Sequence, residues 1–353
     1  MEKLMLKGNE AIAEAAITAG CLHFFGYPIT PQTEVAAYMA RKLPKIGGVY
    51  LQAESEVAAI NMVIGAAAAG VRVMTSSSSP GISLKSEGLS YLSGCDLPAV
   101  IVNIQRGGPG LGGIQPSQSD YFQATRGSGH GDYHLIVLAP GTVQEIVDLT
   151  RRAFDLADKY RVGVMLLGDG VLGQMMEPAV IGEYTPAVPA KPWALTGASG
   201  RPKNIVNSLY LDPEELERTN FERFRKYEQI RRDEVLFEEY QTEDADLVLV
   251  GYGAPGRICR NAVAAARAEG LRAGLFRPVT LYPFPSEALK KLAERAKRFI
   301  SVEMSMGQMV DDVRLAIECR RPVDTCLRTG GVIHTPAEIL EKIRACAKEE
   351  GLI

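Results

Sequence analysis

Short runs of consecutive apolar residues, separated by helical stretches, limit the folds open to this chain more than any other feature. Such runs occupy residues 99–103, 135–138, 162–167 and 247–250. A strand that is apolar on both faces must be covered on both, as in a parallel sheet with helices on each side. Because 353 residues are enough for two such units, we expect an α/β protein with two doubly wound domains.

Changes in composition predict where one unit ends and the next begins. Residues 178–204 are rich in Pro and Gly, and the chain is then strongly charged up to about residue 240. A helix should begin at Asp212-Pro213, because Asp caps a first turn and Pro fits its first position. We expect a first domain at residues 1–180, a linker and charged helix at 181–242, and a second domain at 243–353. The apolar stripe of the charged helix fits either a solvated connecting helix or contact with a partner; it consists of Leu216, Phe224, Tyr227 and Ile230.

Helices and strands should alternate within both domains. The expected helices are at residues 8–20, from the end of the turn at Pro31 to residue 43, and at 57–69, 255–269 and 287–297. Further expected strands are at residues 23–27, 49–52, 71–75, 271–276 and 298–303. The helix at 57–69 is apolar on every side, which predicts that it is fully buried.

The charge and the first residues argue against several classes of protein. The formal net charge is −3 and no basic stripe is present, so nucleic acid is not an expected partner. The N-terminus lacks the apolar core of a signal peptide, and no apolar run approaches the roughly 18 residues of a membrane-spanning helix. We therefore expect a cytoplasmic protein that contacts no membrane.

The cysteines and histidines do not have the spacing of metal ligands. No two of the six cysteines are separated by only two residues, so zinc or an iron–sulfur cluster is not expected on this chain, and the thiols should be reduced. His130 lies in a Gly-rich loop at 127–132. It could approach an active site, but a hydrogen bond to the backbone is the favoured interpretation.

One glycine-rich segment formally fits a dinucleotide-binding motif. Residues 251–256 read Gly-Tyr-Gly-Ala-Pro-Gly between a predicted strand and helix. The next strand, however, ends in Phe276-Arg277 rather than in the acidic residue that would bind a ribose hydroxyl. A tight turn explains the glycines equally well, so nicotinamide binding is a weak alternative.

Glu56 is the most informative polar residue. It lies in the first turn of the apolar helix that follows the strand at 49–52. A buried carboxylate is costly without a partner, and a helix N-terminus stabilises it by only about 0.3–1 kcal/mol. A cofactor nitrogen would supply the missing partner. The alternative is a surface cap, a role that suits Glu54 better.

Several segments, taken in order, resemble the alpha subunits of 2-oxoacid:ferredoxin oxidoreductases. The 2-oxoisovalerate (branched-chain) type is the best match, and the 2-oxoglutarate type is next. The resemblance implies a thiamine-diphosphate pyrimidine-binding fold followed by a transketolase C-terminal-like domain. The segments are residues 27–31 (Tyr-Pro-Ile-Thr-Pro), 56–65, 76–81 (Ser-Ser-Ser-Ser-Pro-Gly), 105–110 (Gln-Arg-Gly-Gly-Pro-Gly) and 303–309.

The same resemblance implies roles for individual residues. Glu56 would hydrogen-bond the aminopyrimidine ring of the cofactor, which promotes deprotonation of the thiazolium carbon. Arg106 would bind the carboxylate of the substrate, with a surface ion pair as the alternative. Thr30 would donate its hydroxyl to substrate or cofactor, with an ordinary turn as the alternative. Pro28, Ile29 and Ser79 would complete the cofactor-binding loops.

The resemblance also implies a hetero-oligomer. Thiamine diphosphate would be shared with a beta subunit that holds the diphosphate and Mg²⁺, while a ferredoxin-like delta subunit would carry 4Fe-4S clusters, and a gamma subunit is expected. The 2-oxoacid would lose carbon dioxide, coenzyme A would take the acyl group as acyl-CoA, and electrons would pass to ferredoxin. No metal ligand is expected on this chain.

The segment Gly168-Asp169-Gly170 is a partial match to the magnesium motif of thiamine enzymes. That motif requires an Asn some residues later, but residues 190–203 contain none and Asn204 stands alone beyond them. A turn after a strand is the favoured interpretation. Two other functions stay open: the beta chain of a lipoamide-linked 2-oxoacid dehydrogenase, and a non-catalytic scaffold subunit.

Overall fold

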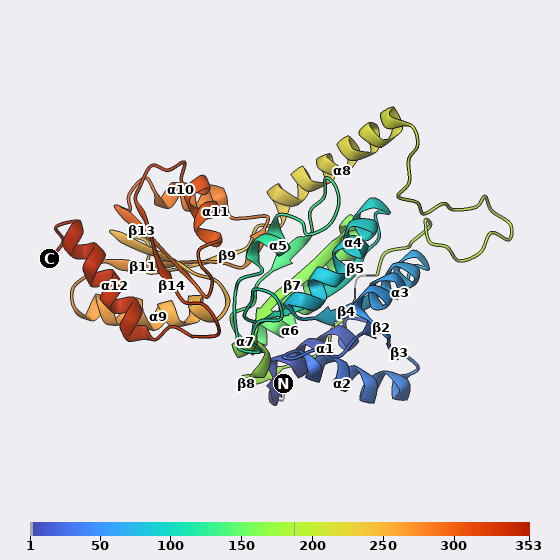
Figure 1. Ribbon diagram of the computed structural model, residues 1–353, viewed down its shortest axis with the longest axis horizontal. Helices are drawn as coiled ribbons and strands as arrows, with labels where there is room; N and C mark the ends of the chain where they lie inside the picture. Colours follow the sequence, from blue (N-terminus) through green and yellow to red (C-terminus); the bar gives the residue numbers. More distant parts are fainter. Residues whose placement is uncertain (1–2, 187) are drawn as a thin grey trace.

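The computed structural model describes residues 3–186 and 188–353, which form two α/β units placed side by side (Figure 1). The first unit contains the N-terminal half of the chain, and the second contains the C-terminal residues. The expected fold of two doubly wound α/β units is confirmed. Among the described residues, no helix has both the length and the apolar character needed to cross a membrane.

A seven-stranded sheet forms the centre of the first unit, in the order β12-β6-β7-β5-β4-β2-β3. Its strands are β2 (His23–Gly26), β3 (Val49–Gln52), β4 (Val73–Ser77), β5 (Ala99–Gln105), β6 (Ile136–Leu138), β7 (Gly163–Asp169) and β12 (Thr280–Tyr282). All neighbours are parallel except β12, which pairs antiparallel with β6. Since β12 comes from the second half of the chain, the two units share this sheet.

Helices cover both faces of this sheet because successive side chains of a buried strand point in opposite directions. Val100 and Val102 of β5 belong to the core under α1 (Gly8–Thr18), α2 (Thr33–Lys42) and α6 (Val143–Tyr160). Ile101 belongs to the core under α3 (Glu56–Ala68) and α4 (Ser79–Gly94). The shorter elements of this unit are η1 (Leu43–Ile46), α5 (Tyr121–Thr125), α7 (Gly170–Gln174) and the antiparallel pair β1 (Lys3–Lys7) and β8 (Met176–Val180).

The second unit repeats this arrangement on a smaller scale. Its sheet has the order β14-β13-β10-β11-β9, and only β9 is antiparallel. Leu247 and Leu249 of β10 face α9 and α12, whereas Val248 and Val250 face α10 and α11, where the core continues into the first unit. The elements are β9 (Phe237–Tyr240), β10 (Leu247–Val250), α9 (Gly253–Ala268), β11 (Ala273–Pro278), α10 (Ser286–Leu292), β13 (Arg298–Glu303), α11 (Met309–Ala316), β14 (Val323–Leu327) and α12 (Pro336–Glu349).

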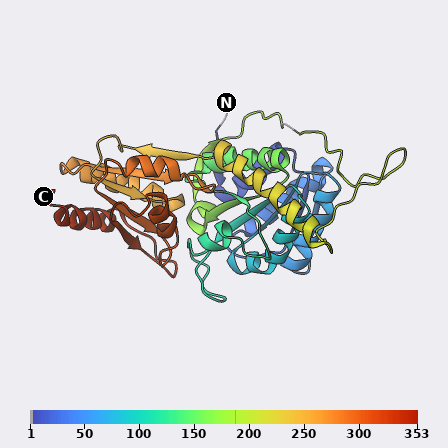
Figure 2. The same cartoon turned by 90° about the horizontal axis from the view of Figure 1, so that it is seen from above.

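The charged helix α8 (Pro213–Asp233) begins as predicted, with the Asp212 side chain accepting a hydrogen bond from the backbone N–H of Glu214. It lies across the first unit (Figure 2). Tyr227 and Ile230 are fully buried in the core of that unit. The inner part of the predicted apolar stripe therefore packs on this chain's own first unit, while the outer face of α8 remains exposed.

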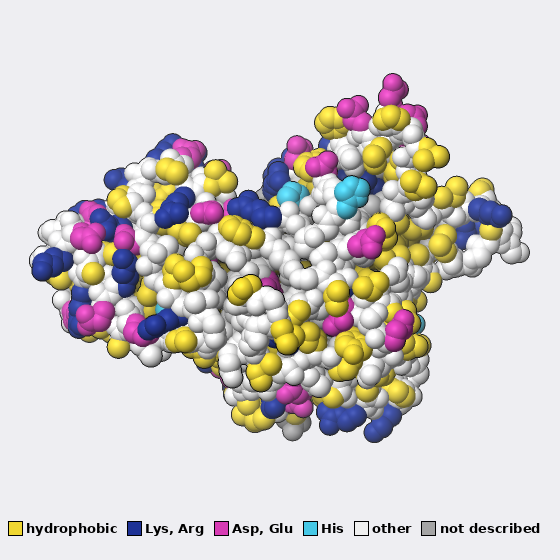
Figure 3. Space-filling view, in the orientation of Figure 1, with side chains coloured by type: hydrophobic (Ala, Val, Ile, Leu, Met, Phe, Trp, Pro, Cys, Tyr) yellow, Lys and Arg dark blue, Asp and Glu magenta, His cyan; other side chains and the backbone are white. Residues whose placement is uncertain are grey.

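The prediction that the helix at 57–69 is fully buried is wrong. The side chain of Val57 is 45% exposed, and Asn61 and Gly65 share its exposed face. Only the face with Ile60 and Val63 packs on α4 and the sheet. Apolar composition predicted burial, but in the single chain one side of this helix has no cover. Further exposed hydrophobic side chains lie on α8 and the segment before it, and Figure 3 shows hydrophobic side chains gathered in this part of the molecule. They include Leu195, Ile205, Leu209, Leu211 and Phe221.

Candidate active site

The strand order of the first sheet reverses between β2 and β4. The chain passes from β2 to β3 on one side and then crosses to β4 on the other, so the order reverses at this point. In open α/β sheets, ligands bind outside the carboxyl ends of the strands at such a reversal. Thr30 and Arg106 lie in the loops after β2 and β5, and Glu56 and Ser79 open the helices after β3 and β4. The fold therefore brings the main predicted site residues to one edge of one sheet.

Glu56 is buried at the N-terminus of α3, with 6% of its surface exposed. Ser55, and not Glu54, caps the helix by accepting a hydrogen bond from the N–H of Ala58. Among the described residues, nothing donates a hydrogen bond to the Glu56 carboxylate. The surface-cap alternative does not fit this burial, and a buried carboxylate without a donor favours a missing partner.

The first turn of α4 approaches Glu56 through a glycine. A β-carbon built on Gly81 would lie 2.7 Å from Glu56 Oε1 and 2.0 Å from Ser77 Oγ. No larger residue could stand here without moving one of these groups. The hydroxyls of Ser77, Ser78 and Thr75 are also buried without hydrogen-bond partners in the described structure. The surroundings of Glu56 thus offer several polar groups without hydrogen-bond partners in the described structure.

Ser79 links the β4 and β5 loops. Its hydroxyl donates to Asp120 Oδ2 at 2.6 Å and accepts from the backbone N–H of Arg106 at 3.0 Å, while its own N–H donates to Asn103 Oδ1 at 3.1 Å. Asn103 also donates to Asp120 at 2.9 Å. Burial raises the pKa of Asp120, and these hydrogen bonds oppose that rise. The Ser79 hydroxyl is therefore already engaged within the protein, and the first turn of α4 that it begins is held in place beside Glu56.

Arg106 is 7% exposed and has no carboxylate partner among the described residues. One terminal nitrogen donates to the carbonyl of Thr30 at 3.0 Å, and the other to the carbonyl of Leu111 at 3.1 Å. Its Nε is buried and without a partner. The surface-ion-pair alternative does not fit these contacts. A buried guanidinium without a counterion suits an anionic ligand, and it also ties the glycine-rich loop to the loop after β2.

The loop after β2 holds Pro28, Ile29 and Thr30. Pro28 and Thr30 are exposed, and Ile29 is half-buried. Thr30 lines a cavity of about 640 Å³ that Gln115, Val171 and Ile333 also border. This volume is typical of small-molecule sites. The backbone of Thr30 contacts Arg106, but its hydroxyl has no partner in the described structure, so it is free to meet a ligand.

Asp169 works as a cap and a link between the units. Its carboxylate accepts hydrogen bonds from the N–H groups of Val171 and Leu172, at 2.9 and 3.1 Å, and from that of Ala254 at 3.2 Å. Burial raises its pKa, and these bonds oppose the rise. The structure fits the favoured interpretation of Gly168-Asp169-Gly170 as a turn after a strand. Asn204 instead donates to the carbonyls of Pro192 and Ala194.

The first unit covers the corresponding strand reversal of the second sheet. The loops after β10 and β13 lie at the strand reversal there, but Gln118 donates to the carbonyl of Tyr252 and exchanges two hydrogen bonds with the backbone of Met304. A β-carbon on Gly253 would be 3.2 Å from Gln118 Nε2. Arg277, where a ribose-binding acid would be expected, pairs with Glu145 and Glu238. The glycines therefore permit close packing between the units, which argues against dinucleotide binding.

Glu303, which opens the segment 303–309, has a structural role. It is fully buried and accepts hydrogen bonds from the N–H groups of Gln308, Met309 and Val310 at 2.8–2.9 Å. The hydroxyls of Ser301 and Ser305 also donate to it. The carboxylate thus holds the start of α11 at the seam between the units.

His130 does not make the expected side-chain hydrogen bond. Its carbonyl accepts a hydrogen bond from the hydroxyl of Ser90, but its imidazole is exposed and has no hydrogen-bond partner in the described part of the chain. The loop is therefore held by its backbone and not by the imidazole of His130. The six cysteines are free thiols.

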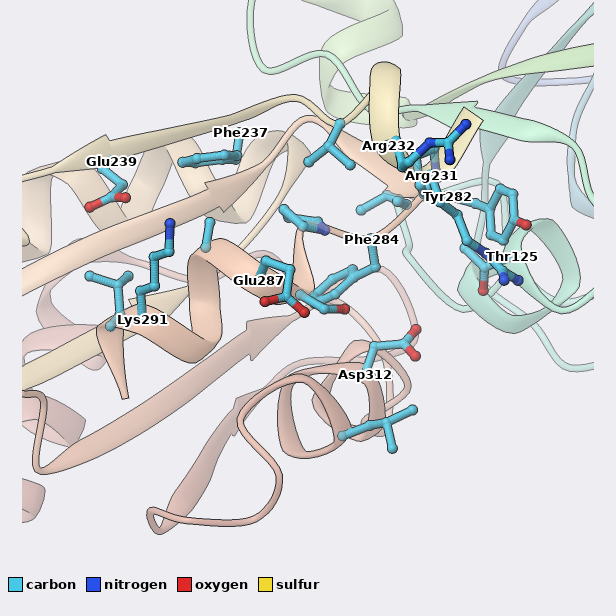
Figure 4. Close-up of a pocket in the computed structure, with 18 of the residues that line it drawn as sticks. Thr125, Arg231, Arg232, Phe237, Glu239, Tyr282, Phe284, Glu287, Lys291 and Asp312 are labelled. Carbon is cyan, nitrogen blue, oxygen red and sulfur yellow. The ribbon is translucent and has the colours of Figure 1, made fainter. Parts of the chain in front are cut away.

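A cavity of about 1060 Å³ opens at the seam between the units, and none of the predicted site residues lines it. Arg231, Arg232 and Tyr282 lie at one end, and Lys291 and Glu239 lie at the other (Figure 4). This cavity does not include Glu56, so it is separate from the strand reversal between β2 and β4.

Comparisons with known proteins agree with this arrangement. Residues 14–228 match the family model "Pyruvate flavodoxin/ferredoxin oxidoreductase, thiamine diP-bdg", and residues 245–339 match "Pyruvate:ferredoxin oxidoreductase core domain II". The ketoisovalerate oxidoreductase subunit VorB of Methanothermobacter thermautotrophicus is 53% identical over 98% of this chain and 99% of its own length. The 2-oxoglutarate synthase subunit KorA of the same organism is 40% identical over 97% and 98%.

Solved structures show the same fold. A 2-oxoglutarate:ferredoxin oxidoreductase from Magnetococcus marinus, with 2-oxoglutarate, coenzyme A and succinyl-CoA bound, has a TM-score of 0.84 and 30% identity over 98% of this chain. The present chain spans 65% of that longer chain. A split-gene transketolase, 12% identical over 97% of this chain with a TM-score of 0.62, shares the fold alone.

Proposed function

The chain belongs to the 2-oxoacid:ferredoxin oxidoreductase family, and from this premise we propose that it is the alpha subunit of an enzyme that oxidatively decarboxylates a branched-chain 2-oxoacid. The proposed substrate is 2-oxoisovalerate, because the relative that is 53% identical is a ketoisovalerate oxidoreductase subunit. The products are acyl-CoA and carbon dioxide, and ferredoxin takes the electrons. The identity of 40% with a 2-oxoglutarate-type subunit makes 2-oxoglutarate the comparison substrate.

The observation that carries this proposal is the Glu56 carboxylate, which is buried at the strand reversal without a hydrogen-bond donor. A ring nitrogen of thiamine diphosphate fits this need. Gly81 leaves room against the carboxylate, and the unpartnered hydroxyls beside it can accept or donate further hydrogen bonds. The described residues therefore fit the pyrimidine half of the cofactor.

Each residue of this chain has a distinct task in the proposed reaction. When bound, the cofactor supplies the carbon nucleophile that a 2-oxoacid needs to lose carbon dioxide. Glu56 holds the proton that the pyrimidine ring nitrogen and the carboxylate share. Arg106 binds the carboxylate of the 2-oxoacid, and Thr30 orients a ligand through its free hydroxyl. Pro28 and Ile29 form the loop that carries Thr30, and Ser79 fixes the start of α4.

Other chains complete the proposed enzyme. We infer that a beta subunit holds the diphosphate and Mg²⁺, because both carboxylate oxygens of Asp169 already accept hydrogen bonds from backbone N–H groups. Among the described residues, no three His, Cys, Asp or Glu side chains form a metal-binding group. Iron–sulfur clusters are assigned to a ferredoxin-like delta subunit, a gamma subunit completes the complex, and the location proposed is the cytoplasm.

Glu56→Gln tests the proposal. The complex is purified as it occurs, and viologen reduction is followed with coenzyme A and 2-oxoisovalerate, 2-oxoglutarate or pyruvate. We expect the highest kcat/KM with 2-oxoisovalerate. General acid–base groups contribute about 10²–10⁴-fold, so kcat of Glu56→Gln should fall by a factor of that order.

Glu54→Gln is the matched control, because Glu54 is exposed two positions before Glu56 and has no role in the proposed chemistry. It should keep wild-type kcat. If the Glu56 variant assembles normally and stays fully active, the assigned role of Glu56 is wrong. If no 2-oxoacid drives viologen reduction by the wild type, the assigned reaction is wrong.

A further inference from the structure

Lys85 is a fully buried lysine beside the proposed cofactor site. It lies on α4 with 0% of its surface exposed. The surrounding sequence, Ser83-Leu84-Lys85-Ser86-Glu87, is that of an ordinary solvated helix, so nothing in the sequence indicated burial. Lysine is almost never fully buried unless a partner compensates for the lost hydration of its charge.

The packing of α4 on α3 places Lys85 next to Glu56. Gly81, Lys85 and Gly88 follow the helical spacing that puts residues on one face. A β-carbon on Gly81 would lie 2.7 Å from Glu56 Oε1, and one on Gly88 would lie 2.4 Å from Cγ1 of Ile60. Both glycines therefore contact α3, and Lys85 stands between these two contacts.

The ammonium of Lys85 points toward the strand end where Glu56 lies. Lys85 Nζ donates a hydrogen bond to the carbonyl of Ser76, in β4, at 3.1 Å. This direction is expected, because side chains in a helix lean toward its N-terminus. Burial lowers the pKa of Lys85 to about 8, and the negative charge of Glu56 opposes that shift. In the described structure the two groups form no direct salt bridge, so the attraction acts across the gap between them.

We propose that Lys85 is a positioning residue that holds the Glu56 carboxylate in place, aimed at the ring nitrogen of the cofactor. This inference rests on the proposed function, since it assigns Lys85 to the task of Glu56. A cation in a buried site stabilises a nearby carboxylate more strongly than it would in water. Lys85 therefore compensates for the charge of Glu56 before the cofactor arrives and keeps it in place afterwards.

A double-mutant cycle tests the pairing of Lys85 and Glu56 without a measurement of enzyme activity. The midpoint of thermal unfolding is measured on the full-length chain without cofactor for Lys85→Met, Glu56→Gln and the double variant. Each single substitution leaves the other buried group without its partner and should lower the midpoint. The double variant should recover much of that loss. Additive losses would overturn the pairing.

The second measurement separates positioning from mere stability. In the assembled complex, Lys85→Met should raise the thiamine diphosphate concentration needed for half-maximal viologen reduction by about tenfold or more, which corresponds to about 1.4 kcal/mol. The KM of the 2-oxoacid should stay near its wild-type value. Lys45→Met, at an exposed lysine without a salt bridge in the described chain, is the matched control and should change neither quantity.

The outcomes distinguish this inference from the proposed function. If Glu56→Gln abolishes turnover while Lys85→Met leaves half-saturation unchanged, the function stands and the role of Lys85 is overturned. If neither substitution affects the cofactor requirement, then both the role of Glu56 and that of Lys85 are overturned. The inference is supported if the losses in the unfolding midpoint are non-additive and Lys85→Met also raises the half-saturating concentration of thiamine diphosphate.

Discussion

Gly81 of α4 lies directly against the carboxylate of Glu56, with 2.7 Å between Glu56 Oε1 and the position of a β-carbon on the glycine. Because real β-carbons do not approach other atoms so closely, only glycine lets α4 and α3 meet at this point. The same β-carbon would lie 2.0 Å from Ser77 Oγ. The contact joins the helix that carries the proposed catalytic acid to the strand end on the other side of the strand reversal.

Gly81→Ala should damage both stability and cofactor use. Overpacking of a buried contact typically costs about 1–3 kcal/mol, and here the displaced group is Glu56 itself. Urea unfolding of the full-length chain measures the free energy, and viologen reduction at increasing thiamine diphosphate measures the cofactor requirement. Gly65→Ala is the stability control, because no atom lies within 4 Å of its added β-carbon and alanine favours helix by about 1 kcal/mol. A Gly81 variant as stable as the Gly65 variant would contradict this packing.

The strands were predictable where they are buried on both faces. The expected segments at 247–250 and 298–303 coincide with the buried strands β10 and β13, and the segment at 49–52 coincides with β3 although that strand is largely exposed. β14 (Val323–Leu327) escaped prediction because two adjacent polar residues, Asp324 and Thr325, interrupt its apolar pattern and the strand is only half-buried. β12 is three residues long and pairs with a strand from the other unit, a contact that no local pattern reports.

The site was predictable in part. Glu56 stood out because a carboxylate opens an apolar helix, and the resemblance to a family, now confirmed, pointed to Arg106, Thr30 and Ser79. Lys85 and Asp120 were missed, since burial of a charged side chain depends on tertiary packing and not on its neighbours in sequence. The exposed side of α3 was missed for the opposite reason: apolar composition says that a face should be covered, but not by which chain.

Arg106→Lys should weaken substrate binding more than it slows turnover. The two terminal nitrogens of Arg106 reach the carbonyls of Thr30 and Leu111, at 3.0 and 3.1 Å. Lysine keeps the charge, but its single nitrogen cannot span both loops. Initial rates should show the KM of the 2-oxoacid raised by about tenfold, or about 1.4 kcal/mol. Arg41→Lys, where the side chain is 67% exposed, should leave KM unchanged; an equal effect in both variants would contradict the assignment.

Asp169→Ala should act on stability and not on magnesium. The substitution removes the cap of α7 and the bond to Ala254 in the second unit, and loss of a cap alone costs about 0.5–2 kcal/mol. Asp212→Ala removes an exposed cap of α8 and should cost less, because no contact between units is lost. Urea unfolding compares the two variants. A change in the Mg²⁺ concentration required for activity, with unfolding unchanged, would instead make Asp169 a metal ligand.

The stability of the fold should fall in mild acid through His134. This ring stacks on Tyr282 with 4.1 Å between centroids, and burial together with the positive charges of Arg231 and Arg126 lowers its pKa from 6.5 to about 4; Asp132 and the backbone of Thr125 oppose the shift. A histidine that is neutral in the fold but protonated when unfolded contributes stability above pH 6.5, and that contribution is lost as the pH falls toward 4. His134→Phe keeps a stacking ring but cannot take up a proton. Unfolding midpoints measured from pH 7.5 to 4.5 should therefore fall more steeply for the wild type than for the variant, and parallel curves would show that His134 does not drive the loss.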